Sequence, residues 1–390
     1  MEMKLKYGCN PHQEFARLLV EQDPSPITFH NGRPGFINLL DLFGAWQLAR
    51  ELKGATGRPG AASFKHVSPA GAAIAGELDE AFRRSQFIPL DEELSPVAAA
   101  YARARGGDRM CSFGDVAAVS DVVDASLAQV IRREVCDALI APGYEPEALE
   151  MLKGKKGGKF LAVEIAREYE PPEIEYRDAF GFRLEQSRNT ARITSDLLTD
   201  VVSEKQDIPD DAATSLLVCT VGLKYAQSNS VGVAYEGQVI GMGAGQQSRV
   251  HCTRLACGKA DKWLLQQHPR VLDLPFKDGL GRPEKTNVVD AFLLWDELAE
   301  AERDWLLDQL DAAPEPLRPA ERAEWIAGFD GIALSSDAFF PFRDSIDRAS
   351  RSHVQYVLQP GGSTRDAVVT EAVDHYGMWM AHSGLRCFLH

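Results

Sequence analysis

Helix-like and strand-like sequence patterns alternate along most of this chain, and this alternation limits the fold more than any other feature. Apolar residues at helical spacing run from Phe36 to Lys53, an apolar strand pattern follows at Ala61 to Phe64, and such patterns alternate up to residue 165. Further helices and strands are indicated from residue 212 to residue 381. Short strands that alternate with amphipathic helices are typical of layered α/β proteins. The sequence therefore predicts an α/β fold.

The chain of 390 residues is longer than one typical domain. We predict a first α/β unit over residues 1–165, a polar connector over 166–210 and a second α/β unit over 211–390. Within the second unit, residues 287–327 have an almost wholly helical pattern interrupted by prolines, which indicates a helical insertion. Both units show the order strand, glycine turn and helix, so we expect two related α/β subdomains.

The adjacent pair Lys65 and His66 is the first candidate for chemistry. In a regular strand neighbouring side chains point to opposite faces, so the two can share a target only where the chain turns. Ser68 is a good helix N-cap, Pro69 suits a first helical position, and residues 70–75 suit a helix start. We therefore expect the pair just ahead of a helix N-terminus, where free backbone N–H groups favour anions. Such a site suits acyl or phosphoryl chemistry; the alternative is a surface loop with two unrelated polar residues.

Three glycine-containing segments carry further expectations. Gly106-Gly107 follows a predicted helix over residues 96–105 and should supply a left-handed C-terminal turn. Residues 154–159 form a basic turn that we interpret as a solvated connection. The glycines of residues 241–245 would let the backbone approach a ligand closely. Their spacing is not that of a dinucleotide fold, and no acidic residue follows a second strand at the required distance, so a nicotinamide site is disfavoured.

Composition excludes several classes of protein. The net charge of −15 argues against a general nucleic-acid binder, although a local basic pocket for a small anion remains compatible with it. No window approaches the roughly 18 uninterrupted apolar residues of a membrane span, and no secretory signal is expected at the N-terminus. The seven cysteines are scattered and contain no C-x-x-C, which predicts reduced thiols in a cytoplasm and no structural zinc.

Several short motifs follow one another in an order that resembles the 5-aminoimidazole-4-carboxamide ribotide (AICAR) formyltransferase family, the transformylase domain of a bifunctional purine-biosynthesis protein. The resemblance covers residues 5–390. The matching motifs are Tyr7-Gly8-x-Asn10-Pro11-His12-Gln13, Ser63 to Gly71, Ala100 to Gly106, Ser112 to Asp115, Ala141 to Tyr144, Gln227 to Ser230, Gly241 to Leu255 and Ser335 to Asp344.

The resemblance implies two cytidine-deaminase-like α/β subdomains and a homodimer with active sites at the subunit interface. It implies transfer of a formyl group from 10-formyltetrahydrofolate to the 5-amino group of AICAR, without the catalytic zinc of the deaminases. This sequence agrees, because its one H-x-E, beginning at His12, has no P-C-x-x-C to complete a zinc site. A bound monovalent cation is left open.

The resemblance also assigns roles to individual positions. His66 is similar to the family's base on the substrate amine, and Lys65 to its partner at the formyl oxygen or the leaving nitrogen. The expected contacts to the ribotide are Lys6, Tyr7, Gly114, Asp137, Asn229, Arg249, Phe339, Arg386 and Phe388. The expected contacts to the folate are Val250, Asp344, Ser363 and Thr364.

Two departures from the family pattern bear on function. The family's usual first domain, an inosine-monophosphate (IMP) cyclohydrolase, has no counterpart ahead of residue 5, so we expect a separate protein to close the purine ring. Lys6 stands where the family usually has Arg. A ribotide-binding module without catalysis is the alternative function; it would be favoured if Lys65 or His66 were replaced, and both are present.

Overall fold

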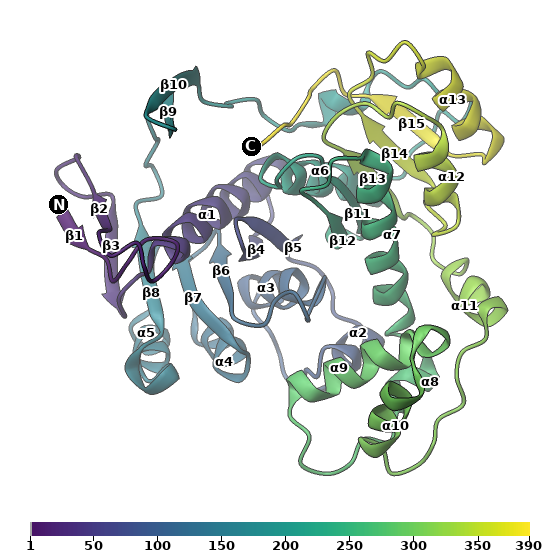
Figure 1. The fold of residues 1–390 in the computed structure, drawn as a ribbon, viewed down its shortest axis with the longest axis horizontal. Helices are drawn as coiled ribbons and strands as arrows, with labels where there is room; N and C mark the ends of the chain where they lie inside the picture. The colour runs from purple at the N-terminus through teal and green to yellow at the C-terminus, as the bar shows by residue number, and fades with distance from the viewer. Residues whose placement is uncertain (1) are drawn as a thin grey trace.

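The computed structural model describes residues 2–390. Within them, one mixed 11-stranded sheet runs through the molecule in the order β15-β14-β13-β11-β12-β5-β4-β6-β7-β8-β3 (Figure 1). Its strands are β3 (Ile27–Asn31), β4 (Gly60–Lys65), β5 (Ser68–Ile74), β6 (Asp115–Val119), β7 (Cys136–Ala141), β8 (Leu161–Ile165), β11 (Val231–Tyr235), β12 (Gln238–Gly243), β13 (Ala333–Ser336), β14 (Tyr356–Gln359) and β15 (Trp379–His382). Two separate hairpins pair β1 (Glu2–Lys4) with β2 (Arg17–Leu19), and β9 (Ile174–Ala179) with β10 (Phe182–Ser187).

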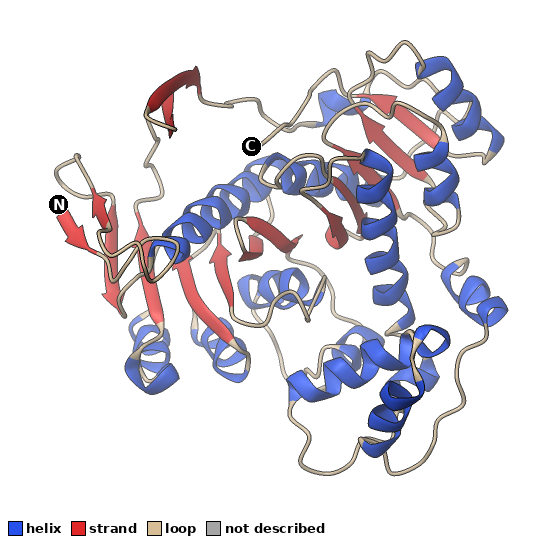
Figure 2. Cartoon of the chain, in the orientation of Figure 1, coloured by secondary structure: helices blue, strands red, loops and turns tan. Residues whose placement is uncertain are grey.

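Helices cover both faces of the sheet, which confirms the predicted α/β class (Figure 2). α1 and α6 contact each other on one face, while α3 and α7 cover the other. The helices are α1 (Phe36–Thr56), α2 (Glu80–Ser85), α3 (Pro96–Gly106), α4 (Ala125–Arg133), α5 (Pro146–Lys153), α6 (Asp210–Lys224), α7 (Arg249–Leu265), α8 (Pro269–Leu272), α9 (Arg282–Leu293), α10 (Glu300–Asp308), α11 (Pro319–Ile326), α12 (Asp344–Ser350) and α13 (Asp366–His375). None of those within residues 2–390 has the length and hydropathy of a membrane span.

The two predicted α/β units share this single sheet through the pairing of β5 with β12. Gln238 of β12 lies opposite Ala73 of β5 in an antiparallel pair, and the Ile74 N–H donates to the Gly237 carbonyl over 3.1 Å. The buried Arg103 of α3 closes the junction, because its guanidinium donates to the Ile74 carbonyl over 2.8 Å. The Gln238 amide in turn donates to the Arg103 carbonyl over 2.8 Å. The junction is therefore hydrogen-bonded on both strands.

The helix predicted from Ser68 onward is wrong, because Ser68–Ile74 forms strand β5. Helix propensity is a weak prior, and here the pairing with the neighbouring strands overrides the helix preference of alanine. β5 lies between β4 and β12 and is buried on both faces. At Gly71 a side chain would stand 2.0 Å from the Ala104 carbonyl oxygen of α3, so only glycine fits where the strand meets this helix.

The glycines of two other segments serve packing rather than the roles expected of them. Gly107 ends α3 in a right-handed conformation, so the predicted left-handed turn is wrong. A Cβ there would stand 2.2 Å from the Val239 carbonyl oxygen. Gly241 and Gly243 lie within β12, where a Cβ would stand 2.1 and 2.2 Å from carbonyl oxygens of α7. These glycines let a helix approach a strand closely, in place of a ligand.

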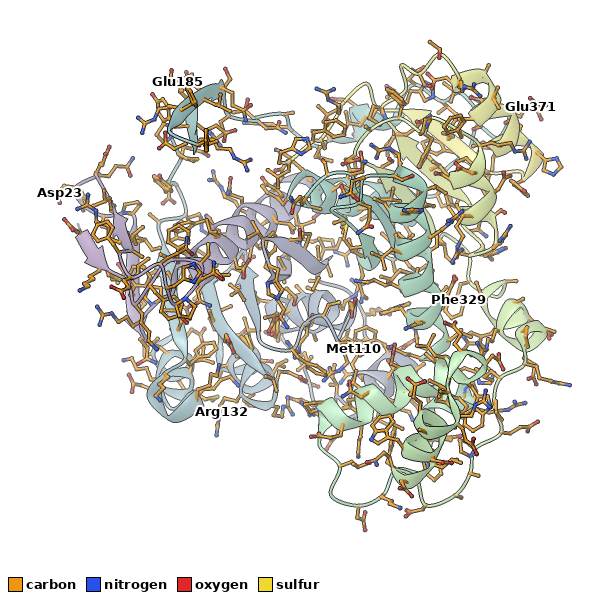
Figure 3. All side chains as sticks on the ribbon, in the orientation of Figure 1. Asp23, Met110, Arg132, Glu185, Phe329 and Glu371 are labelled. Carbon is orange, nitrogen blue, oxygen red and sulfur yellow. The ribbon has the colours of Figure 1, made fainter. Side chains whose placement is uncertain are left out.

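The segment 166–210 is more structured than the polar connector expected from its composition. Its β9–β10 hairpin projects from the body of the molecule (Figure 1), and Glu185 marks it in Figure 3. Every residue of both strands is exposed. The segment predicted to be a helical insertion, residues 287–327, carries most of α9 together with α10 and α11, whose apolar residues share one core with those of α7.

Gly71 offers a test of the packing of α3 on β5. We expect Gly71→Ala to lower the free energy of unfolding by roughly 1–3 kcal/mol, because the backbone oxygen of Ala104 cannot move out of the way. Gly54, in the last turns of α1, is the matched control because a Cβ there meets nothing within 4 Å. Gly54→Ala should leave stability unchanged or raise it by up to about 1 kcal/mol. Chemical denaturation of both variants measures the difference, and equal effects would contradict the proposed steric cause.

Candidate active site

The candidate site residues lie along one edge of the large sheet. The register pairs Phe64, near the end of β4, with Val116, near the start of β6. It pairs Val231, the first residue of β11, with both Gly243 and Ser336, which end β12 and β13. β14 and β15 run parallel to β13, so their carboxyl ends lie at this edge as well. The edge therefore collects the Lys65-His66 pair and the loops of the second half of the chain.

Lys65 and His66 stand at a tight hairpin turn between β4 and β5. Lys65 pairs with Ser68 across the hairpin, and the two residues between them, His66 and Val67, have φ of 53° and 58°. Positive φ at both central positions belongs to a type I′ turn, which normally takes Asn and Gly. A β-branched valine there is strained, at a cost of about 1–3 kcal/mol. Such a turn persists only where its surroundings hold it.

Asp41 of α1 is the group that holds the turn from behind. Its carboxylate accepts the Val67 N–H over 2.7 Å, and the side chain is buried with 4% of its surface exposed. Burial raises the pKa of Asp41, while the N–H of Val67, the charge of His66 and the N–H of His66 act to lower it. Our sequence analysis missed Asp41, because an isolated Asp among apolar helix residues carries no motif.

A first cluster forms around the Lys65 ammonium, which donates to the Phe113 carbonyl over 2.6 Å. The next residue, Gly114, turns with φ of +74°, and a Cβ there would stand 3.8 Å from an Asp137 carboxylate oxygen. Asp137 forms an ion pair with Lys156. The structure thus brings Lys65, Gly114 and Asp137 together and adds Lys156, which our interpretation of residues 154–159 as a solvated connection did not single out.

A second cluster forms around Arg249, which is buried at the start of α7. Its guanidinium donates to the Asn229 side-chain oxygen over 2.8 Å and to the Ser336 hydroxyl over 2.9 Å. It also forms an ion pair with Asp337, which is 1% exposed. Buried charges persist only when they are paired and hydrogen-bonded, so this pair fixes the side chains of both Arg249 and Asn229.

The C-terminal tail is attached to the same cluster. The Cys387 N–H donates to the Asp337 carbonyl over 2.9 Å, and the Leu389 N–H donates to the Ser228 hydroxyl over 3.1 Å. Beside these anchors, the Arg386 guanidinium lies 4.7 Å from the Phe388 ring centroid. Both side chains are exposed. The anchors thus place an exposed cation and an aromatic ring beside the Arg249 cluster.

One contact joins the two clusters. The Gln227 N–H lies 3.5 Å from the Ser68 hydroxyl, at the end of the hairpin turn, and the Gly245 N–H donates to the Gln227 carbonyl over 2.7 Å. Gln227 is two residues ahead of Asn229. The Lys65-His66 turn and the Arg249 cluster are therefore neighbours at the sheet edge.

The residues expected on the folate side follow the ends of β13 and β14. Asp344 begins α12, while Ser363 and Thr364 precede α13. The loops before these helices contact each other, since the Arg365 guanidinium lies 4.9 Å from the Phe342 ring centroid. Val250 follows Arg249 on α7, and Phe339 is exposed two residues after Asp337.

Two of the expected ribotide residues, Lys6 and Tyr7, are not part of the contacts described above. They follow β1, and the Lys6 ammonium lies 5.5 Å from the Tyr7 ring centroid. Within residues 2–390 no hydrogen bond or ion pair joins either residue to Arg386 or Phe388. Among the same described residues, no group of three or more His, Cys, Asp or Glu side chains is placed to hold a metal ion.

Comparisons with known proteins agree on one family. A family model described as the AICARFT/IMPCHase bienzyme matches residues 1–259. Two relatives are both described as bifunctional purine biosynthesis protein PurH. The protein from Roseobacter denitrificans is 28% identical over 390 residues, and the protein from Magnetococcus marinus is 30% identical over 396 residues. Each alignment covers 99% of this chain and 59% of the relative, so the chain spans about three fifths of their length.

The buried Arg249–Asp337 pair provides a test of the second cluster. Asp337→Ala leaves the Arg249 guanidinium uncompensated, so we expect a loss of about 3–5 kcal/mol in the free energy of unfolding. The control is Asp347→Ala, which removes the exposed pair with Arg343 and should cost less than about 1 kcal/mol. Urea unfolding curves decide between the two, and a loss at Asp337 no larger than the control would refute a structural role for this pair.

Proposed function

Because the chain belongs to the AICARFT/IMPCHase bienzyme family, we propose that it is an enzyme of purine biosynthesis that catalyses the formyl transfer of that family. It takes the formyl group from 10-formyltetrahydrofolate, places it on the 5-amino group of AICAR and releases formyl-AICAR and tetrahydrofolate. One observation carries the proposal: Lys65 and His66 lie on a turn at the sheet edge that also holds the Arg249 cluster.

His66 is proposed as the base on the substrate amine. The lone pair of this arylamine is delocalised toward the carboxamide, so the amine is a poor nucleophile. A neutral imidazole near pH 7 can accept its proton as the nitrogen attacks the formyl carbon. His66 is exposed at the turn, where a substrate can reach it. The new bond joins the amine nitrogen to the formyl carbon, and the amine proton passes to the imidazole.

Lys65 is proposed to act on the other partner of the reaction. The formyl carbon becomes tetrahedral and its oxygen gains negative charge, which a neighbouring ammonium stabilises by several kcal/mol in a dry site. The bond to the folate nitrogen then breaks, and that nitrogen takes up a proton. The half-buried Lys65 ammonium is anchored on the Phe113 carbonyl, which keeps a cation at the turn.

The remaining expected residues bind the two substrates. For the ribotide we propose the region where the two clusters meet, with Gly114 and Asp137 on one side and Asn229, Arg249 and Phe339 on the other. Arg386 and Phe388 of the tail supply an exposed cation and ring. For the folate we propose the loops that carry Asp344, Ser363 and Thr364, together with Val250. The local cations explain how a chain of net charge −15 can bind an anionic ribotide.

An assay of the purified protein tests this function. On mixing the protein with AICAR and 10-formyltetrahydrofolate, the difference absorbance should report tetrahydrofolate formation. No turnover by the folded protein would refute formyl transfer. Supplied with formyl-AICAR, the protein should form no IMP above the uncatalysed rate, because the residues assigned by the resemblance belong to formyl transfer. Catalysed ring closure would show a cyclohydrolase site in this chain. A cytoplasmic location remains a prediction from the cysteine pattern.

We expect His66→Ala to lower kcat by roughly 10²–10⁴-fold, which is the usual contribution of a general base. The KM for AICAR should change little, because the ribotide contacts are elsewhere along the edge. The matched control is His375→Ala, whose exposed imidazole lies at the end of α13 outside both clusters. Steady-state kinetics give both constants, and a kcat close to the wild-type value would remove the role from His66.

We expect Lys6→Ala to raise the KM for AICAR with little change in kcat. Phosphate lies away from the reacting amine, so its contacts are similar in the ground and transition states. A charge-assisted contact is worth roughly 1.5–3 kcal/mol, or about a tenfold to a hundredfold rise in KM. Lys6→Arg should keep or improve affinity through the planar guanidinium. An unchanged KM in Lys6→Ala would exclude Lys6 from the site.

A homodimer is the proposed assembly, with active sites at the interface. The exposed β9–β10 hairpin supports it. Its apolar side chains are far more exposed than a lone chain normally tolerates, with Phe180 fully exposed and Phe182 at 70%. Lys6 and Tyr7, which form no hydrogen bond or ion pair with Arg386 or Phe388 among residues 2–390, are proposed to serve the site of the partner. No nucleic acid or membrane is proposed as a partner.

The hairpin gives the test of this assembly. Sedimentation at micromolar concentration should give about twice 42.9 kDa for the wild type. Phe182→Asp should shift the mass toward a single chain, since it puts a charge into the proposed interface. Trp305→Asp is the control, because Trp305 is 45% exposed on α10, in the helical insertion. A fully active wild-type monomer would contradict the shared site.

A further inference from the structure

The residue types in the turn that carries His66 do not favour the conformation that this turn adopts. Both His66 and Val67 have positive φ, which is uncommon for residues other than glycine and is an outlier for a β-branched residue such as valine. Valine is among the least suited, because its branched Cβ crowds the carbonyl. Neither of the two turn positions holds the Asn or Gly that usually stabilises such a turn. The turn must therefore be held by a group outside the hairpin.

Asp41 is placed to provide that restraint from a rigid element. It is the sixth residue of α1, a 21-residue helix that packs along β4, and a Cβ at Gly44 of the same helix would stand 2.8 Å from the Phe64 ring. The helix therefore packs closely against the Phe64 side chain near the end of β4. From this position the buried Asp41 carboxylate reaches over the end of β4 and accepts the Val67 N–H over 2.7 Å.

The restraint changes which way the reacting side chains can point. In an extended strand Lys65 and His66 would lie on opposite faces. The left-handed turn ends that alternation after Lys65, whose ammonium is separately anchored on the Phe113 carbonyl of the adjoining loop.

We propose that Asp41 is a positioning residue for the formyl transfer: it holds the His66-Val67 turn in its left-handed conformation through the Val67 N–H, so that Lys65 and His66 face one reaction centre. Asp41 itself does not contact the substrate. This inference rests on the function proposed above and deepens it. It assigns a role to a buried group of α1 that no motif identifies.

Kinetics of two substitutions at Asp41 separate the hydrogen bond from other contributions. Asp41→Ala removes the acceptor, and we expect kcat to fall about 30-fold or more, because misplacement of a reacting group by about 1 Å costs up to about a hundredfold. The KM for AICAR should stay within about threefold, since the ribotide contacts are untouched. Asp41→Asn keeps an oxygen that can accept the Val67 N–H, so its kcat should fall no more than about fivefold.

A double-substitution cycle with Val67 gives the readout that a structural role would not produce. Glycine adopts positive φ readily, so Val67→Gly should relieve the need for the restraint. In the Val67→Gly background, adding Asp41→Ala should lower kcat by no more than about fivefold. The matched control is Asp121→Ala, which removes the ion-pair partner of Lys53. Lys53 also belongs to α1, but this pair lies at the end of the sheet opposite the turn, so kcat should be unchanged.

Three results would overturn the proposal: a kcat for Asp41→Ala close to the wild-type value, equal losses in the alanine and asparagine variants, or the same loss from Asp41→Ala with and without Val67→Gly. Amide hydrogen exchange of the peptide spanning residues 64–70 adds a readout that needs no activity, and Asp41→Ala should lose protection there while α3 keeps its own. A wild type without formyl transfer would refute the proposed function alone, because the exchange experiment still reports whether Asp41 holds the turn.

Discussion

The site depends on the pairing of β5 with β12, which joins the two halves of the chain into one sheet. This pairing aligns the ends of strands that are far apart in sequence, so that the turn after Lys65 meets the loops before β11 and after β13. The buried Arg103 satisfies the carbonyl of Ile74 at this junction and is itself held by Gln238. A one-residue slip in this pairing would move every side chain of the strand to the other face of the sheet. The junction therefore also fixes which strand ends lie next to one another.

The edge is pre-organised by charges that water does not reach. Asp41 behind the turn, and Asp337 behind Arg249, are each 4% exposed or less and accept hydrogen bonds from the backbone of the loops they hold. A buried carboxylate is costly unless it is paired, so each loop gains its conformation from the same contacts that make the carboxylate tolerable. Strain at Val67 and burial at Asp41 are thus two sides of one arrangement.

The two ends of the chain differ in how they are attached to the candidate site. The tail from Cys387 to Leu389 is hydrogen-bonded to Asp337 and Ser228, which ties Arg386 and Phe388 to the second cluster. Within the part of the chain that the structure describes, Lys6 and Tyr7 form no hydrogen bond to Asp337 or Ser228. Together with the exposed apolar hairpin β9–β10 (Figure 3), this asymmetry is what the proposed homodimer explains.

The sequence by itself determined the long helices, the strands with strong apolar runs and the family. α1 and α3 lie where the sequence predicts helices, because the signals for a helix are local. The tertiary structure decided the rest. Ser68–Ile74 became a strand because β4 and β12 bury it on both faces, and Gly107 and Gly241 serve close contacts whose partners are remote in sequence. The motifs identified Lys65 and His66 as candidates, but Asp41 and Lys156 joined them only through folding, since local sequence carries no signal for a contact made across the sheet.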